Sequence, residues 1–139
     1  MSYGHGEGVE QDNMKAVEWH SKAAEQGAAH AQFNLGLFYD HGDGVEQDKV
    51  NAMEWYTKAA EQGDTKAQCN LGGCYDNGAG VEQDAAKATE WYSKAAEQGY
   101  ANAQYNLGVC YATGVGVEQA KAKAVEWYTK AAEQGYVNA

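Results

Sequence analysis

The chain has 139 residues, 44% of them apolar, which suits one domain with enough apolar side chains for a core. Its 20 acidic residues outnumber its 10 basic ones, all lysine, and the formal net charge is −10. Nucleic acids and anionic membranes are bound through lysine and arginine, so this charge argues against both as partners. No apolar run approaches the roughly 20 residues of a membrane-spanning helix.

Residues 1–8 contain no basic residue and no apolar stretch, so we expect no secretory signal there. The 3 cysteines are too few for a disulfide framework, and their odd number fits reduced thiols better. A cytoplasmic location is therefore favoured.

Tryptophan recurs at a fixed interval, because Trp19, Trp55, Trp91 and Trp127 lie 36 residues apart. A period of this length indicates stacked structural repeats. We therefore expect a single repeat domain over residues 1–139. It divides into a partial repeat at 1–27, full repeats at 28–63, 64–99 and 100–135, and a stub at 136–139.

Residues 1–27 match the last part of a repeat, because Tyr3 lies 36 residues before Tyr39. They predict the tail of a first helix, a loop and a complete second helix. Solenoids usually have polar capping repeats at both ends, and neither end shows one here. Two hypotheses follow: a fragment of a longer array, or a chain whose ends stack on copies of itself.

The repeat at 28–63 has the pattern of a helix, a loop and a second helix. Ala31, Leu35 and Tyr39 follow helical spacing and predict the buried face of a first helix that ends near Gly42. The loop at 42–47 contains two glycines able to adopt positive φ. Val45 is expected to lie tucked beneath this loop.

The second helix is expected to begin after Asp48, whose carboxylate suits an N-cap. Its apolar stripe includes Tyr56, and it ends before Gly63, which suits a left-handed position after the helix. On its solvent face Glu54 precedes Lys58 by four residues, which predicts an ion pair that recurs in every repeat.

Glycine also recurs in the middle of each first helix, at Gly36, Gly72 and Gly108. Glycine there costs about 1 kcal/mol relative to alanine. We infer a close contact with the partner helix that leaves no room for a Cβ, and we expect small side chains such as Ala59 and Ala60 opposite.

Long stretches of the chain resemble the Sel1-like repeats, relatives of the tetratricopeptide repeats. They are AQFNLGLFYDHGDGVEQD, AQCNLGGCYDNGAGVEQD and AQYNLGVCYATGVGVEQA, followed by EWYTKAAEQG or EWYSKAAEQG. The resemblance covers nearly the whole chain. It implies an all-α fold, a right-handed α-solenoid of antiparallel helix pairs, which serves as an adaptor in protein complexes without cofactor or catalysis.

The chain departs from the pattern at a few positions. Ala120 stands at the position of the capping aspartates Asp12, Asp48 and Asp84, and the lost cap costs the last second helix about 1 kcal/mol. His20 replaces the tyrosine seen at Tyr56, which predicts weaker packing at the N-terminal end. Some branches of the family staple their two helices with paired cysteines. The cysteines here lie only in first helices, so we expect no such staple.

The sequence shows no convincing catalytic or metal site. A zinc site needs three or four ligands, and the histidines form no cluster with cysteine at ligand spacing. The glycine loops follow helices and lead into no Gly-Lys-Ser/Thr, so phosphate binding is not indicated. We expect no enzyme activity, no cofactor and no metal, and we interpret four histidines as surface residues: His5, His20, His30 and His41.

The three cysteines occupy two repeat positions. Cys74 and Cys110 align with Phe38 on the apolar face and are expected to be buried. Cys69 aligns with Phe33, and we expect it to be the more exposed thiol and the first to react.

Positions that differ between repeats are available to form a surface, whereas identical ones build the core. In the first helices the differing positions share one side, which by resemblance to the tetratricopeptide relatives lines a concave groove. The predicted partner-binding residues are His30, Phe33, Leu37, Asp40, His41, Lys66, Cys69, Gly73, Asp76, Asn77, Asn102, Tyr105, Val109 and Thr113.

This surface is partly apolar and weakly acidic, with Lys66 as its one fixed positive charge. We expect a protein or peptide partner with apolar anchors and some basic character. The recurring Asn34, Asn70 and Asn106 bond either a ligand backbone or the chain's own helices. The alternative function is a structural spacer or a self-associating module, stacked end to end, without a groove ligand.

Overall fold

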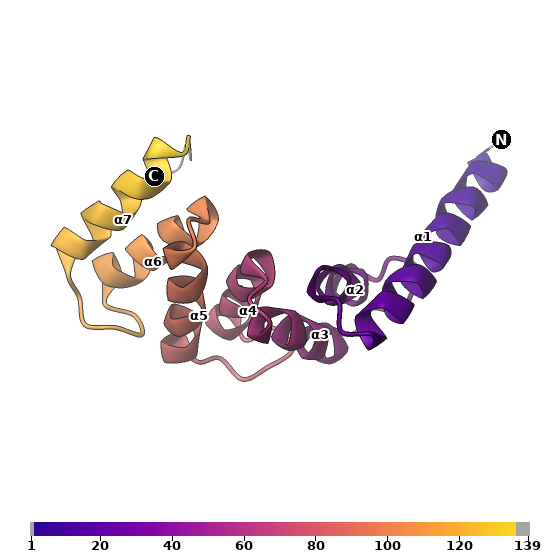
Figure 1. Ribbon diagram of the computed structural model, residues 1–139, viewed down its shortest axis with the longest axis horizontal. Coiled ribbons are helices and arrows are strands. Elements are labelled where there is room, and N and C mark those ends of the chain that lie inside the picture. The colour runs from indigo at the N-terminus through magenta and orange to yellow at the C-terminus, as the bar shows by residue number, and fades with distance from the viewer. Residues whose placement is uncertain (1, 136–139) are drawn as a thin grey trace. The chain divides into compact units, whose positions relative to one another are not determined.

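The computed structural model describes the backbone of residues 2–135 and the side chains of residues 12 and 14–135. Within this part every regular element is an α-helix, which confirms the predicted all-α class. The helices are shown in Figure 1: α1 Ser2–Glu25, α2 Ala29–His41, α3 Lys49–Glu61, α4 Thr65–Asn77, α5 Ala85–Glu97, α6 Ala101–Thr113 and α7 Lys121–Glu133.

The helices form two compact units, Met1–Asp64 and Thr65–Ala139. In the first unit α2 packs against both α1 and α3. In the second unit α4 packs against α5, α5 against α6, and α6 against α7. Within each unit the helices therefore pack on their neighbours along the chain, as in an α-solenoid.

The loop between α2 and α3 folds back onto the helix that precedes it. Gly42 ends α2 with a φ of 74°, and the N–H of Asp48 donates to the carbonyl of Tyr39 at 2.9 Å. Val45 is half-buried and packs against the core of this unit. The predicted helix end and the tucked valine are both confirmed.

Aspartate caps two of the second helices. The Asp48 carboxylate accepts from the N–H of Asn51 at 3.0 Å, and Asp84 accepts from the N–H of Lys87 at 3.1 Å. Ala120 takes up the same extended backbone ahead of α7 but makes no side-chain bond. The caps predicted at Asp48 and Asp84 and the missing cap at Ala120 are confirmed.

A left-handed glycine follows each of α3 and α5. The φ of Gly63 is 97°, its N–H donates to Ala60, and the N–H of Asp64 reaches back to the Ala59 carbonyl at 3.1 Å. These bonds satisfy the last carbonyls of the helix, which would otherwise lack partners. Gly99 repeats the arrangement with a φ of 94°.

The mid-helix glycines do mark a close approach, but the residue opposite is not the one expected. A Cβ on Gly36 would lie 2.7 Å from ring atoms of Tyr56 and 3.3 Å from the Ala52 carbonyl oxygen. Gly72 meets Tyr92 in the same way. The expectation of small alanines opposite was therefore wrong: the missing Cβ makes room for a buried tyrosine ring.

Helix α1 differs from the partial repeat expected at residues 1–27. It runs without a break from Ser2 to Glu25, so it includes the glycines predicted to form a loop and also Asp12, predicted as a cap. The later loops close by bonding to carbonyls of the preceding helical turn, as Asp48 does to Tyr39. In α1 the aligned segment continues as helix instead.

The lysines predicted to pair with glutamate lie over tryptophan rings instead. Lys58 Nζ is 4.5 Å from the centroid of Trp55, and Lys94 Nζ is 4.4 Å from that of Trp91. A cation over an indole face gains about 0.5–1 kcal/mol at an exposed site, more than an exposed i, i+4 ion pair. This stacking replaces the predicted Glu54–Lys58 pair.

Candidate protein-binding surface

Helices α4 and α6 of the second unit lie next to one another. The Nδ2 of Asn106 donates to Cys69 Sγ across 4.0 Å, and Cys69 shares a buried cluster with Leu107. Two residues of each helix from the predicted binding set are exposed, and two are half-buried. The exposed ones are Lys66, Asn77, Asn102 and Thr113, and the half-buried ones are Gly73, Asp76, Tyr105 and Val109.

In the first unit the predicted binding residues lie on α2. His30 and His41 are exposed near its two ends, and Leu37 and Asp40 are half-buried between them. The side chain of His5, which aligns with His41, lies outside the described residues.

Phe33 and Cys69 are buried, with 7% and 8% of their surface exposed, so the expectation that they line an open surface was wrong. Phe33 packs against the Tyr56 ring, with centroids 5.9 Å apart. The residue lies three positions before Gly36, and this spacing puts both on the helix face turned to Tyr56. The recurring glycine was the sequence signal for that burial.

The burial of the thiols also reverses the expected order of reactivity. Burial raises the pKa of Cys69 to about 11, despite the hydrogen bond from Asn106. Burial likewise raises the pKa of Cys110, which is 8% exposed. Cys74 is half-buried rather than buried, so it is the most accessible of the three thiols.

Asp40 joins the two helices of its hairpin. Its carboxylate accepts from Tyr56 Oη at 3.0 Å and from Lys49 Nζ at 2.8 Å. Burial acts to raise the pKa of Asp40, but these two hydrogen bonds outweigh it and hold the pKa below its usual range. Asp40 is therefore a structural link between α2 and α3 as well as part of the surface.

Sequence reasoning missed a network in which buried glutamines of the first helices bond to exposed glutamines at the ends of the second helices. Gln32 Nε2 donates to the Ala24 carbonyl at 3.1 Å, and Gln62 Nε2 donates to Gln32 Oε1 at 2.6 Å. The second unit repeats both bonds, with Gln98 donating to Gln68 and Gln104 to the carbonyl of Ala96. The signal available was the 36-residue recurrence of glutamine on both helices. These bonds satisfy polar groups inside the core.

Two of the recurring asparagines, Asn34 and Asn106, have hydrogen-bond partners on the chain's own helices. The Nδ2 of Asn34 lies 3.2 Å from Nε2 of His20, as Asn106 lies near Cys69. His20 also bonds the Ala16 carbonyl and packs edge-on against Phe38. It is half-buried, so it is not the surface histidine expected.

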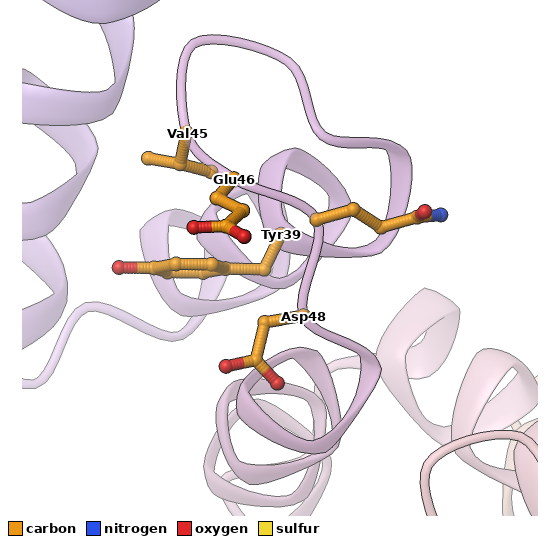
Figure 2. A pocket seen from close by; sticks show the side chains of 5 residues that line it. Tyr39, Val45, Glu46 and Asp48 are labelled. Carbon is orange, nitrogen blue, oxygen red and sulfur yellow. The ribbon is translucent and has the colours of Figure 1, made fainter.

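A shallow pocket accompanies the loop in each unit. The first has a volume of about 480 Å³ and is shown in Figure 2. The second has a volume of about 380 Å³. A tyrosine, the loop valine and two carboxylates line each of them: Tyr39, Val45, Glu46, Gln47 and Asp48 in the first, and Tyr75, Val81, Glu82, Gln83, Asp84 and Lys87 in the second. The sequence had not indicated pockets here.

Among the described residues, no group of three or more His, Cys, Asp or Glu side chains is arranged to hold a metal ion. None of the described helices has the length and apolar character needed to span a bilayer.

A family model for the Sel1 repeat matches residues 1–27, 29–64, 65–100 and 101–136. The chain belongs to the Sel1 repeat family. Sel1 repeat proteins are generally protein-interaction scaffolds and are generally non-catalytic. The predicted membership and the helical repeat fold are confirmed.

Solved structures of Sel1 proteins are similar to this chain. A Sel1 repeat protein from Oxalobacter formigenes is 43% identical, with a TM-score of 0.83 over 88% of this chain and 50% of its own. A protective antigen of uropathogenic Escherichia coli with an SLR fold is 46% identical, with a TM-score of 0.88 over 96% of this chain and 29% of its own. Helicobacter pylori cysteine rich protein B is 28% identical, with a TM-score of 0.72 over 91% of each chain.

The chain thus spans half or less of the first two structures. A search of curated proteins found no match.

Proposed function

We propose that this Sel1 repeat chain is a non-catalytic scaffold that binds a peptide segment of another protein across α4 and α6. One observation supports the proposal: on these neighbouring helices the predicted binding positions other than Cys69 are exposed or half-buried, whereas the leucines that the repeats share are buried. Lys66 and Asn102 occupy one repeat position and are both exposed, while Leu71 and Leu107 occupy another and are 0% and 1% exposed. Packing constrains the buried pair, and the exposed pair is available for recognition.

The chemistry of the surface favours a peptide with basic and apolar residues. The net charge of the chain is −10, and Asp76 adds a carboxylate to this face. The half-buried Tyr105 and Val109 offer apolar contacts beside it. Charge complementarity steers association, while the apolar contacts supply the anchor. The exposed His30 and His41 of α2 belong to the corresponding surface of the first unit.

Selection from a phage-displayed random peptide library on the immobilised full chain tests this proposal. Selected peptides should combine lysine or arginine with apolar residues. The double variant Asn77→Arg/Thr113→Arg should weaken their binding at least tenfold by calorimetry. The matched control Ala86→Arg/Ala122→Arg adds the same charge at exposed positions of α5 and α7 and should change binding less than about twofold, as expected of surface substitutions outside a site. Equal effects of the two double variants would contradict a site on α4 and α6.

The alternative, a self-associating module, is favoured by exposed apolar residues on α1 and α7. Val125 is 62% exposed, whereas Met53 and Thr89 at the same repeat position are 7% and 4% exposed. Trp19 on α1 is 74% exposed. Light scattering across a range of chain concentrations, with Val125→Glu as the variant, tests this alternative. A mass that stays monomeric at every concentration would rule it out.

A further inference from the structure

The pocket of the first unit presents one aromatic ring and two carboxylates. Tyr39 forms one wall, and it also packs against the buried core of this unit. In Figure 2 the ring is seen edge-on, with the Glu46 carboxylate above it and the Asp48 carboxylate below. Both acidic residues are exposed. An aromatic face beside carboxylates attracts a cation through the ring quadrupole and through charge.

In the second unit a lysine of the chain itself occupies the equivalent place. Lys87 lines the pocket there, and its Nζ lies 5.4 Å from the centroid of Tyr75. The last repeat also places a lysine over its tyrosine, with Lys123 Nζ 5.4 Å from the centroid of Tyr111, although Ala120 there replaces the aspartate. An alkylammonium group therefore fits this combination of tyrosine and loop in two separate repeats.

The repeat that contains Tyr39 lacks that lysine. Asn51 stands at the repeat position held by Lys15, Lys87 and Lys123. The pocket lining there includes the two carboxylates and no lysine. The neighbouring Lys49 directs its Nζ to Asp40 Oδ1 at 2.8 Å. Tyr39, Glu46 and Asp48 thus match Tyr75, Glu82 and Asp84 of the pocket that Lys87 lines, in the one complete repeat that does not supply the lysine.

We propose that the pocket at Tyr39, Glu46 and Asp48 is a binding site for the ammonium group of a lysine side chain from a partner protein. The ammonium lies over the Tyr39 ring, at the place that Lys87 takes over Tyr75, and the carboxylates balance its charge. The alkyl chain of the lysine lies against Val45. This site is separate from the surface on α4 and α6, and its test does not depend on that surface.

Titration of the ¹⁵N-labelled full chain with N-acetyl-lysine methylamide tests the site by two-dimensional NMR at constant ionic strength. Backbone amides 45–51 should shift towards saturation, at a Kd on the order of 100 mM, as expected for one cation at an exposed aromatic site. Amides 81–87 of the same sample serve as an internal control and should shift much less. The probe N-acetyl-norleucine methylamide has the same alkyl chain without the ammonium and should produce no saturable shift.

Two reciprocal substitutions decide the result. Asn51→Lys supplies the missing lysine and should reduce the shifts at 45–51 at least fivefold. Lys87→Asn should open a second site, so that amides 81–87 then shift as amides 45–51 do. Both exchange residues that sibling repeats already carry, so the fold is retained. Equal shifts of the two loops in the unaltered chain, equal shifts with the norleucine probe, or no new site in Lys87→Asn would each overturn the proposal.

Discussion

Gly72 and Gly73 are adjacent in α4, and replacing each with alanine should change stability in opposite directions. A Cβ on Gly72 would lie 2.8 Å from two ring atoms of Tyr92 and 3.2 Å from the Ala88 carbonyl oxygen. A Cβ on Gly73 would have Tyr92 Oη as its nearest neighbour, at 3.8 Å. The first position is already filled by a ring, whereas the second has ordinary van der Waals space.

The magnitudes follow from two opposing terms. Alanine in place of a helical glycine gains about 1 kcal/mol at either position. At Gly72 the ring must also move by roughly 1 Å to restore normal carbon contacts, and such overpacking costs about 1–3 kcal/mol. Tyr92 is 4% exposed, which leaves it little space to move. We therefore expect Gly73→Ala to stabilise by about 1 kcal/mol and Gly72→Ala to destabilise by up to about 2 kcal/mol.

Urea unfolding followed by circular dichroism at 222 nm measures both variants against the unaltered chain. Both substitutions lie in one helix of one unit, so both report on the same unfolding transition even if the two units unfold separately. The midpoint should rise for Gly73→Ala and fall for Gly72→Ala, with similar slopes. If Gly72→Ala stabilised the chain as much as Gly73→Ala, the tyrosine-contact explanation of the recurring glycine would be refuted.

Three further predictions concern the cap, the thiols and the acid response. Ala120→Asp should stabilise the chain by about 1 kcal/mol by capping α7, and an unchanged urea midpoint would count against it. At pH 8 a maleimide probe should label Cys74 first and Cys69 slowest, because roughly 0.1% of a thiol with a pKa of about 11 is ionised at that pH. Mass spectrometry of timed samples shows the order of labelling, and early labelling of Cys69 would contradict the prediction. Because the folded-state pKa of Asp40 is lowered, its contribution to stability is present at neutral pH and is lost as pH falls from about 4 through that lower pKa. Asp40→Asn should therefore lower the urea midpoint at pH 7 and make that midpoint fall less steeply below pH 4. If the midpoints of the variant and the unaltered chain fell in parallel below pH 4, the link between Asp40 ionisation and stability would be disproved.

Features that depend on neighbouring residues in the chain could be predicted from the sequence. The helix end at Gly42 and the cap at Asp48 follow from backbone conformation and from amide groups a few residues away. The 36-residue interval likewise predicted stacked helical pairs, because identical spacing of apolar residues requires identical packing. The loop predicted within residues 1–27 was wrong, because these residues continue as one helix from Ser2 to Glu25.

Which side chains of the first helices are buried could be known only from the tertiary structure, because a helix in a stack contacts neighbouring helices on more than one side. Variation between repeats suggested that Phe33 and Cys69 face solvent, yet one packs on Tyr56 and the other lies beneath α6. The sequence alone determined the repeat, its helices and their ends, since these depend on local spacing and on residues with special backbone preferences. Only the packed helices decided which varying side chains remain accessible and that Tyr39 lines a pocket with Glu46 and Asp48, because those outcomes depend on side chains brought together by the fold.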